Sequence, residues 1–179
     1  IDRTIESFLK SQLESDYVPD LLITIGGNVI SKKLKALFRR HKASITNHWN
    51  FGDEVMDTYQ SLTRLIKVDP APVLSFLKDL PQNTQYQFGN KWRAQFFQME
   101  QRHLSFLAKC PYSDLKVFEL INDFIPEGAN VQMGNSSVVR YFQLFNQLRN
   151  VSYFGNRGVS GIEGCTSTAV GAAQASDDV

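Results

Sequence analysis

The chain has 179 residues, of which 42% are hydrophobic, and a formal net charge of +1. This length and apolar content suit one domain, or one and part of another, and the near-zero charge does not point to nucleic acid. Cys110 and Cys165 lie far apart without CxxC spacing, which argues against a disulfide framework or zinc site and favours a reducing compartment. We find neither an apolar run long enough for a membrane span nor a signal peptide pattern.

The first part of the chain alternates short apolar runs with helical patterns. Residues 21–25 form an apolar run closed by Gly26 and Gly27, which is typical of a buried parallel strand. Strands separated by helices through short connections predict a parallel sheet with helices on both faces. The predicted elements are an amphipathic helix from Ile1 to Leu13, strand 21–25, a helix capped by Ser31, strand 43–46, strand 63–68 and a helix opened by Asp69 and Pro70.

The pattern changes at residues 83–109, a polar and aromatic helical stretch broken near 88–90 and stopped by Cys110 and Pro111. Its aromatic stripe is more typical of packing than of a ligand site. Beyond it a second α/β unit is predicted, and because the chain begins without methionine and inside a helix, it resembles an excerpt. The elements of this unit are helix 114–124, turn 126–128, strand 130–133, helix 136–148, strand 151–154, loop 155–164 and helix 165–175.

Two loops of the second unit carry the candidate chemistry. In an open parallel sheet, ligands bind beyond the carboxyl ends of the strands, where loops lead into helices. The loop 134–136 opens a helix whose N–H groups favour an anion, and Arg140 follows one turn later. The next strand is followed by Arg157, whose planar guanidinium suits carboxylate or phosphate oxygens. Glycines 158, 161 and 164 permit close approach of the backbone; taken singly, they are also compatible with tight turns, and the arginines with surface ion pairs.

The motifs GNSSVVR and NRGVSGIEG, about seventeen residues apart, resemble the start of the diphosphate-binding domain in the thiamine diphosphate-dependent 2-succinyl-5-enolpyruvyl-6-hydroxy-3-cyclohexene-1-carboxylate synthase family. DLLITIGG followed by Lys32 resembles the family's central, cofactor-free domain. The resemblance implies a central α/β domain at 1–111 and the first part of the diphosphate-binding domain at 112–179. It also implies a transferase of menaquinone biosynthesis, which decarboxylates 2-oxoglutarate and adds the succinyl semialdehyde unit to isochorismate.

The same resemblance implies roles for single residues. Arg140 and Arg157 are expected to be catalytic and to bind substrate carboxylates, as a clamp over the coenzyme. Lys32, with Lys33 as the adjacent alternative, is expected to reach the substrate pocket. The cofactor-binding residues expected on this basis are Ser136, Gly161 and Ile162. The cofactors are thiamine diphosphate and Mg²⁺; no metal ligand is expected within the chain, since the magnesium ligands should follow Val179 and the activating glutamate belongs to a preceding domain.

The resemblance further implies a cytoplasmic protein, a homodimer or homotetramer when full-length, with no nucleic acid partner. Two alternatives stay open: a thiamine diphosphate enzyme of the acetolactate synthase type, and a non-enzymatic α/β module whose glycine-rich loop binds a nucleotide. Paired arginines suit dicarboxylates better than pyruvate, which favours the 2-succinyl-5-enolpyruvyl-6-hydroxy-3-cyclohexene-1-carboxylate synthase family over the acetolactate synthase type. The basic run from Lys32 to Lys42 is more typical of the solvated side of a helix than of an RNA-binding face. The three histidines lack metal-ligand spacing.

Overall fold

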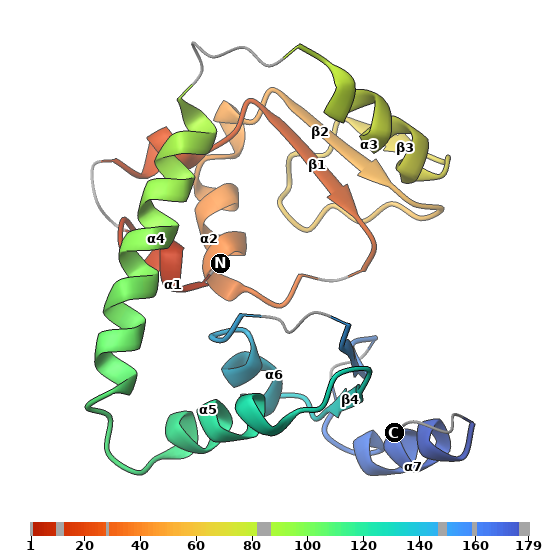
Figure 1. Cartoon of the computed structure of the whole chain (residues 1–179). Coiled ribbons are helices and arrows are strands. Elements are labelled where there is room, and N and C mark those ends of the chain that lie inside the picture. Colours follow the sequence, from red (N-terminus) through yellow and green to blue (C-terminus); the bar gives the residue numbers. More distant parts are fainter. Residues whose placement is uncertain are drawn as a thin grey trace. The chain divides into compact units, whose positions relative to one another are not determined.

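The computed structural model describes residues 2–9, 13–27, 29–81, 87–146, 150–158 and 161–175. The chain forms two compact units, Ile1–Gln101 and Arg102–Val179, and the boundary between them in the sequence falls within one long helix. Both are α/β units with parallel sheets, which confirms the predicted fold class (Figure 1). The elements of the first unit are α1 (Asp2–Glu6), η1 (Glu14–Tyr17), β1 (Leu21–Ile25), α2 (Lys32–Arg40), η2 (Lys42–Ser44), β2 (Asn47–Phe51), β3 (Arg64–Ile66), α3 (Pro70–Asp79) and the first part of α4 (Phe88–Leu107).

The sheet of the first unit has the order β1-β2-β3, and both strand pairs are parallel. Leu21 pairs with Asn47 at one end, and Ile25 pairs with Phe51 at the other. Because all three strands run the same way, their carboxyl ends lie at one edge of the sheet (Figure 1). The predicted strand 21–25 is confirmed, and β3 is the central part of the predicted strand 63–68.

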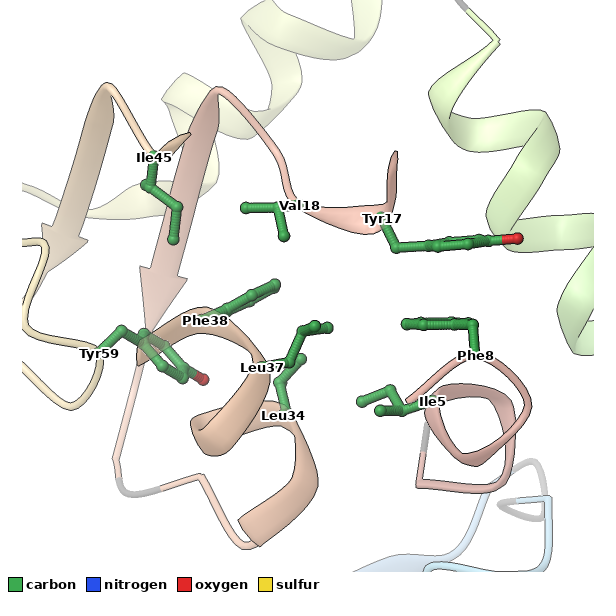
Figure 2. Packing of buried hydrophobic residues seen from close by; sticks show 9 residues of the cluster. All are labelled: Ile5, Phe8, Tyr17, Val18, Leu34, Leu37, Phe38, Ile45 and Tyr59. Carbon is green, nitrogen blue, oxygen red and sulfur yellow. The ribbon is translucent and has the colours of Figure 1, made fainter. Parts of the chain in front are cut away.

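A cluster of buried side chains packs α1 and α2 against this sheet (Figure 2). The rings of Phe8 and Tyr17 stack with their centroids 3.8 Å apart, and Trp92 of α4 meets the ring of Phe8 edge-on at 5.4 Å. The Trp92 contact agrees with the packing role predicted for the aromatic stripe. Each fully buried side chain of this size contributes about 1.5–3 kcal/mol. The cluster comprises Ile5, Phe8, Tyr17, Val18, Leu34, Leu37, Phe38, Ile45 and Tyr59.

The second strand of this sheet lies later in the chain than predicted. Residues 42–44 form the short helix η2, and the strand is β2, Asn47–Phe51, so the prediction of a strand at 43–46 is wrong. The physical reason is that β2 buries polar side chains. Asn50 donates a hydrogen bond of 2.9 Å to Thr24 Oγ1, and His48 Nε2 lies 3.0 Å from the same oxygen. A pattern of apolar residues cannot reveal a strand whose interior contacts are polar.

Three helix boundaries also differ from the sequence prediction. The first helix ends at Glu6 instead of reaching Leu13, and Ser7 Oγ donates to Thr4 O (2.6 Å) where it ends. α4 begins at Phe88 and runs without a break, so Gly89 stands in its first turn instead of interrupting it; residues 82–86 lie outside the described part. α6 ends at Phe142 instead of residue 148, and 147–149 also lie outside the described part.

The second unit is built on two parallel strands, β4 and β5, paired from Asn130↔Ser152 to Met133↔Gly155. The turn before β4 places Gly128 at a φ of +83°, and its N–H donates to Asn150 O at 2.9 Å. The ring of Phe118 in α5 stacks on Tyr141 of α6 with the centroids 5.0 Å apart. The elements are the end of α4, α5 (Asp114–Phe124), β4 (Asn130–Met133), α6 (Ser137–Phe142), β5 (Ser152–Gly155) and α7 (Cys165–Ala175). The predicted α5, β4 and α7 are confirmed.

Candidate functional site

The loops that follow β4 and β5 leave the sheet at the same edge. Met133 and Gly155, the last residues of the two strands, are partners in the parallel register. The approach is close, since a Cβ on Gly155 would lie 3.4 Å from Met133 O. The carboxyl edge of a parallel sheet is where ligands bind in open α/β folds. The structure therefore brings together the two loops that the sequence marked as candidates.

Asn135 ties these loops to each other. Its side chain is buried, with 5% of its surface exposed. Its Nδ2 donates to Asn156 O at 2.8 Å and to Gly161 O at 2.6 Å, and its Oδ1 accepts a hydrogen bond of 2.7 Å from Arg157 Nη1. Sequence reasoning gave Asn135 no role. The one sequence feature that could have indicated such a role is its place just after a predicted strand, since an amide side chain can both donate and accept hydrogen bonds.

Arg157 lies half-buried beside Asn135 in the loop after β5. An amide oxygen carries no formal charge, so this hydrogen bond orients the guanidinium without neutralising it. A fixed, planar, positively charged group with several N–H donors is suited to a carboxylate or phosphate. The position of Arg157 thus agrees with the predicted anion-binding role, which stays a prediction.

Three other predicted site residues of the second unit are exposed: Arg140, Ser136 and Ile162. Arg140 is exposed and stands in the last turn of α6. Ser136 is exposed, and its hydroxyl does not cap α6. Ile162 is 67% exposed, next to Gly161, whose carbonyl Asn135 holds. An exposed apolar side chain beside a fixed backbone can support an apolar ligand surface.

Ser136 has an unusual backbone conformation, with φ +67° and ψ −116°. Glycine adopts this region at no steric cost, whereas a residue with a Cβ is strained there by about 1–3 kcal/mol. Such strain persists where the surrounding structure enforces it, and it concentrates at functional sites. The conformation therefore supports a functional role for this serine.

Lys32 lies in the first unit and is not part of the geometry described for the arginines. It is exposed at the start of α2, directly after Ser31, whose Oγ accepts from Leu34 N at 3.0 Å. Lys33 forms an ion pair with Glu6. Within the part of the chain that the structure describes, Lys32 is in no ion pair. This favours Lys32 over Lys33 as the lysine that can meet a substrate.

Two arginines at the end of α2 have partners in their own unit. Arg40 Nη1 contacts both carboxylate oxygens of the buried Glu14, at 2.7 and 2.6 Å. Arg39 Nε donates to Thr58 O at 2.8 Å. Arg39 and Arg40 are nevertheless exposed, as expected for the solvated side of a helix.

A cavity of about 340 Å³ lies at the carboxyl edge of the first unit's sheet, lined by residues that include Ile25, Phe51 and Lys67. α3 begins at this edge, but its N-terminus offers little to a phosphate. Asp69 caps it by accepting from Ala71 N at 3.0 Å, and Pro70 at its first position has no N–H. This arrangement does not favour a nucleotide site at α3.

A buried polar cluster surrounds His48 of β2. The ring is fully buried, with Nε2 3.0 Å from Thr24 Oγ1 and Nδ1 3.1 Å from Ser61 Oγ. Burial lowers the pKa of His48 below its ordinary value, and the Asp57 carboxylate, 4.0 Å away, opposes this shift. Burial also raises the pKa of Tyr59, whose ring packs against His48. These groups join β1, β2 and the loop before β3, so their evident role is structural.

Among the described residues, no group of three or more His, Cys, Asp or Glu side chains is placed to hold a metal ion. The described helices likewise include none with the length and apolar character to cross a membrane.

No family model matches the chain. It is similar, however, to curated proteins named 2-succinyl-5-enolpyruvyl-6-hydroxy-3-cyclohexene-1-carboxylate synthase. The protein from Flavobacterium psychrophilum is 37% identical over 186 residues, which cover 98% of this chain and 32% of that protein. The protein from Bacteroides thetaiotaomicron is 36% identical over 89% of this chain and 28% of its own length. The chain is a homologue of part of these synthases.

Similarity to the synthases extends over both compact units, since the match with the Flavobacterium johnsoniae protein also covers 95% of this chain. The resemblance seen in the sequence is thereby confirmed. The chain spans about a third of the length of the curated synthases that it matches.

Proposed function

We propose that the chain is the central domain and the first part of the diphosphate-binding domain of a 2-succinyl-5-enolpyruvyl-6-hydroxy-3-cyclohexene-1-carboxylate synthase. The full-length enzyme decarboxylates 2-oxoglutarate and adds the succinyl semialdehyde unit to isochorismate in menaquinone biosynthesis. The observation that carries the proposal is the homology to synthases of that name over both units. A cytoplasmic homodimer or homotetramer is part of the same proposal, as are domain boundaries at 1–111 and 112–179.

In this proposal the side chains at the β4–β5 edge bind the acidic substrates. Arg157, oriented by Asn135, and Arg140 on α6 donate hydrogen bonds to substrate carboxylates. Both substrates are carboxylic acids, so a pair of guanidinium groups gives binding energy and stabilises negative charge that develops during the reaction. Lys32 serves the isochorismate side of the pocket.

The residues present fit the reactive end of thiamine diphosphate. Ile162 offers an exposed apolar side chain, Gly161 has a carbonyl held in place by Asn135, and Ser136 has an exposed hydroxyl. When bound, the coenzyme supplies the electron sink that decarboxylation of a 2-oxo acid requires. In the proposal, Mg²⁺ and the activating glutamate are held by parts of the full-length protein outside this segment.

The test is arginine replacement in the full-length protein that contains this segment. Arg140→Ala should lower kcat/KM for 2-oxoglutarate by roughly 30-fold, because loss of one partner of a desolvated charge pair costs at least about 2 kcal/mol. Its unfolding midpoint should not change, since Arg140 is exposed. Arg157→Ala should lower kcat/KM similarly and also reduce stability by about 1–3 kcal/mol, because it leaves the buried Asn135 Oδ1 without its donor.

Arg93→Ala provides the matched control, since Arg93 is an exposed arginine whose guanidinium bonds Asn90 in its own helix. This variant should keep wild-type kinetics. If Arg140→Ala and Arg157→Ala both retain normal kcat/KM for 2-oxoglutarate, the proposed substrate site is wrong.

A further inference from the structure

We infer that Asn135 is a positioning residue, which acts on the substrate through Arg157 and through the loop before α7. The inference rests on the proposed function, because it takes Arg157 to be a substrate-binding group. It adds a residue to which neither the sequence motifs nor the homology gave a role.

The first observation behind it is the number of segments that one buried side chain joins. Asn135 follows β4, and its three hydrogen bonds reach the backbone of Asn156, the backbone of Gly161 and the guanidinium of Arg157. Both amide N–H groups and the amide oxygen are thus engaged, at 2.8, 2.6 and 2.7 Å. No other standard side chain of this size offers two donors and a neutral acceptor.

The second observation is the neutrality of the acceptor. A carboxylate at position 135 would pair with the guanidinium as an ion and would compete with an acidic substrate for it. The amide oxygen fixes the direction of Arg157 Nη1 and itself places no negative charge beside it. Asparagine at position 135 therefore orients Arg157 without forming an ion pair with it.

The third observation concerns the loop that leads into α7. Gly161 O accepts from Asn135, and Cys165 Sγ lies 3.8 Å from the same oxygen. Gly164, at φ +78°, then turns the chain into α7. Fixing Gly161 also fixes the neighbouring Ile162, so a single amide sets the relative place of the arginine and of the apolar side chain.

The experiment is a double-mutant cycle in the full-length protein. Asn135→Ala should lower kcat/KM for 2-oxoglutarate by about tenfold, the worth of an orienting hydrogen bond to a charged group. In the Arg157→Ala background the same substitution should lower kcat/KM by no more than about threefold, because the part of its effect that acts through Arg157 is already lost and only the part that acts through the loop before α7 remains.

Phe118→Leu is the control for general destabilisation. Phe118 packs on Tyr141 and Phe142 between α5 and α6, and its described ring contacts do not involve the residues of the two loops. Its effect on kcat/KM, corrected for folded fraction, should be negligible in both backgrounds.

Asn135→Asp is an independent test of the positioning role, because aspartate has nearly the same shape as asparagine. It retains the acceptor for Arg157 but loses the donors to the two carbonyls, and it adds a competing negative charge. We expect KM for 2-oxoglutarate to rise by about tenfold while kcat changes less. A purely structural Asn135 would instead lower the folded fraction and leave KM unchanged.

Limited trypsin digestion supplies a measurement that does not depend on turnover. Cleavage between Arg157 and Gly158 requires the loop to leave its place. Asn135→Ala should therefore speed cleavage at this bond at least about fivefold, as expected when a hydrogen bond that closes a local structure is lost. Phe118→Leu should not speed cleavage at this bond selectively.

The possible results distinguish the substrate-binding role of Arg157 from the positioning role of Asn135. If Arg157→Ala leaves kcat/KM unchanged, the proposed function of Arg157 fails. If Arg157→Ala impairs the enzyme but the effect of Asn135→Ala is as large in that background as in the wild type, the positioning role of Asn135 is overturned and the proposed function stands.

Discussion

At the scale of a single residue, Ser136 shows that the candidate site contains backbone strain, which lowers the stability of the fold. Its φ of +67° with ψ −116° favours glycine, yet a serine occupies the position. Nothing in the hydrogen bonding of α6 explains the choice, since its hydroxyl does not cap this helix. A serine in a strained position, at the edge where ligands bind, is the combination expected of a functional hydroxyl.

We therefore expect Ser136→Gly to raise the free energy of unfolding of the chain by up to about 1 kcal/mol, since glycine relieves the strain. Ser136→Ala keeps the Cβ, and with it the strain, so it should not stabilise the chain. Both variants remove the hydroxyl and should weaken coenzyme binding in the full-length protein. Denaturant unfolding of the three chains side by side makes the comparison; an alanine variant more stable than the glycine variant would contradict it.

For Arg157 the sequence predicted the position in the fold but not the contact with Asn135. The motifs placed Arg157 after a strand, and the structure confirms that position. They could not show that Arg157 rests on Asn135, because the two residues are 22 positions apart and their hydrogen bond depends on the register of β4 and β5. A contact that arises only when two strands pair has no local pattern in the sequence.

At the scale of helices and strands, too, the elements with a local sequence pattern could be predicted and those that depend on tertiary contacts could not. β1, α5, β4 and α7 have local signals, such as apolar runs, helical spacing and turn residues, and they were predicted within a residue. β2 was missed because His48 and Asn50 are buried through bonds to Thr24 on the neighbouring strand. Its polarity is a consequence of tertiary structure, so a hydrophobic pattern could not reveal it.

β2 also gives the first unit a predictable response to acid. The pKa of His48 in the folded chain is lower than the ordinary value of 6.5, because burial disfavours the charged ring. Above that ordinary value the ring is neutral in both states, and the stability is complete. As pH falls below it, the unfolded chain binds a proton that the folded chain resists, so the folded state loses up to about 1.4 kcal/mol per pH unit.

We expect the unfolding free energy of the wild-type chain to fall as the pH drops below the ordinary histidine pKa of 6.5, and the fall to be smaller in His48→Gln. His41→Gln, which replaces a half-buried ring whose Nε2 lies 3.0 Å from Glu14 Oε2, is the comparison for histidine loss as such. The measurement is urea unfolding at a series of pH values. Equal pH profiles for the wild type and His48→Gln would show that His48 does not govern this dependence.

At the scale of the whole molecule, the chain is two compact units that together match about a third of each related synthase. In the proposed function, the segment contributes substrate-binding groups, and the activating acid and the metal site lie elsewhere in the full-length protein. Binding groups without these parts cannot carry out the reaction.

The 179-residue chain should therefore show no turnover of 2-oxoglutarate with thiamine diphosphate and Mg²⁺, in the presence or absence of isochorismate. Carbon dioxide release from labelled 2-oxoglutarate is the measurement, with the full-length protein as the positive control. Release by the segment alone, at a rate near that of the full-length protein, would show that the domain assignment is wrong.

The bond between Asn135 and Arg157 has a consequence for how this protein can evolve. Loss of Arg157 leaves the buried Asn135 Oδ1 without its donor, and loss of Asn135 removes the acceptor that lies 2.7 Å from Arg157 Nη1. In the proposed function Arg157 also binds a substrate carboxylate, so a paired exchange could restore a hydrogen bond but not the binding of the substrate. Homologous chains that keep the proposed activity and an arginine at position 157 should therefore also keep the asparagine at position 135.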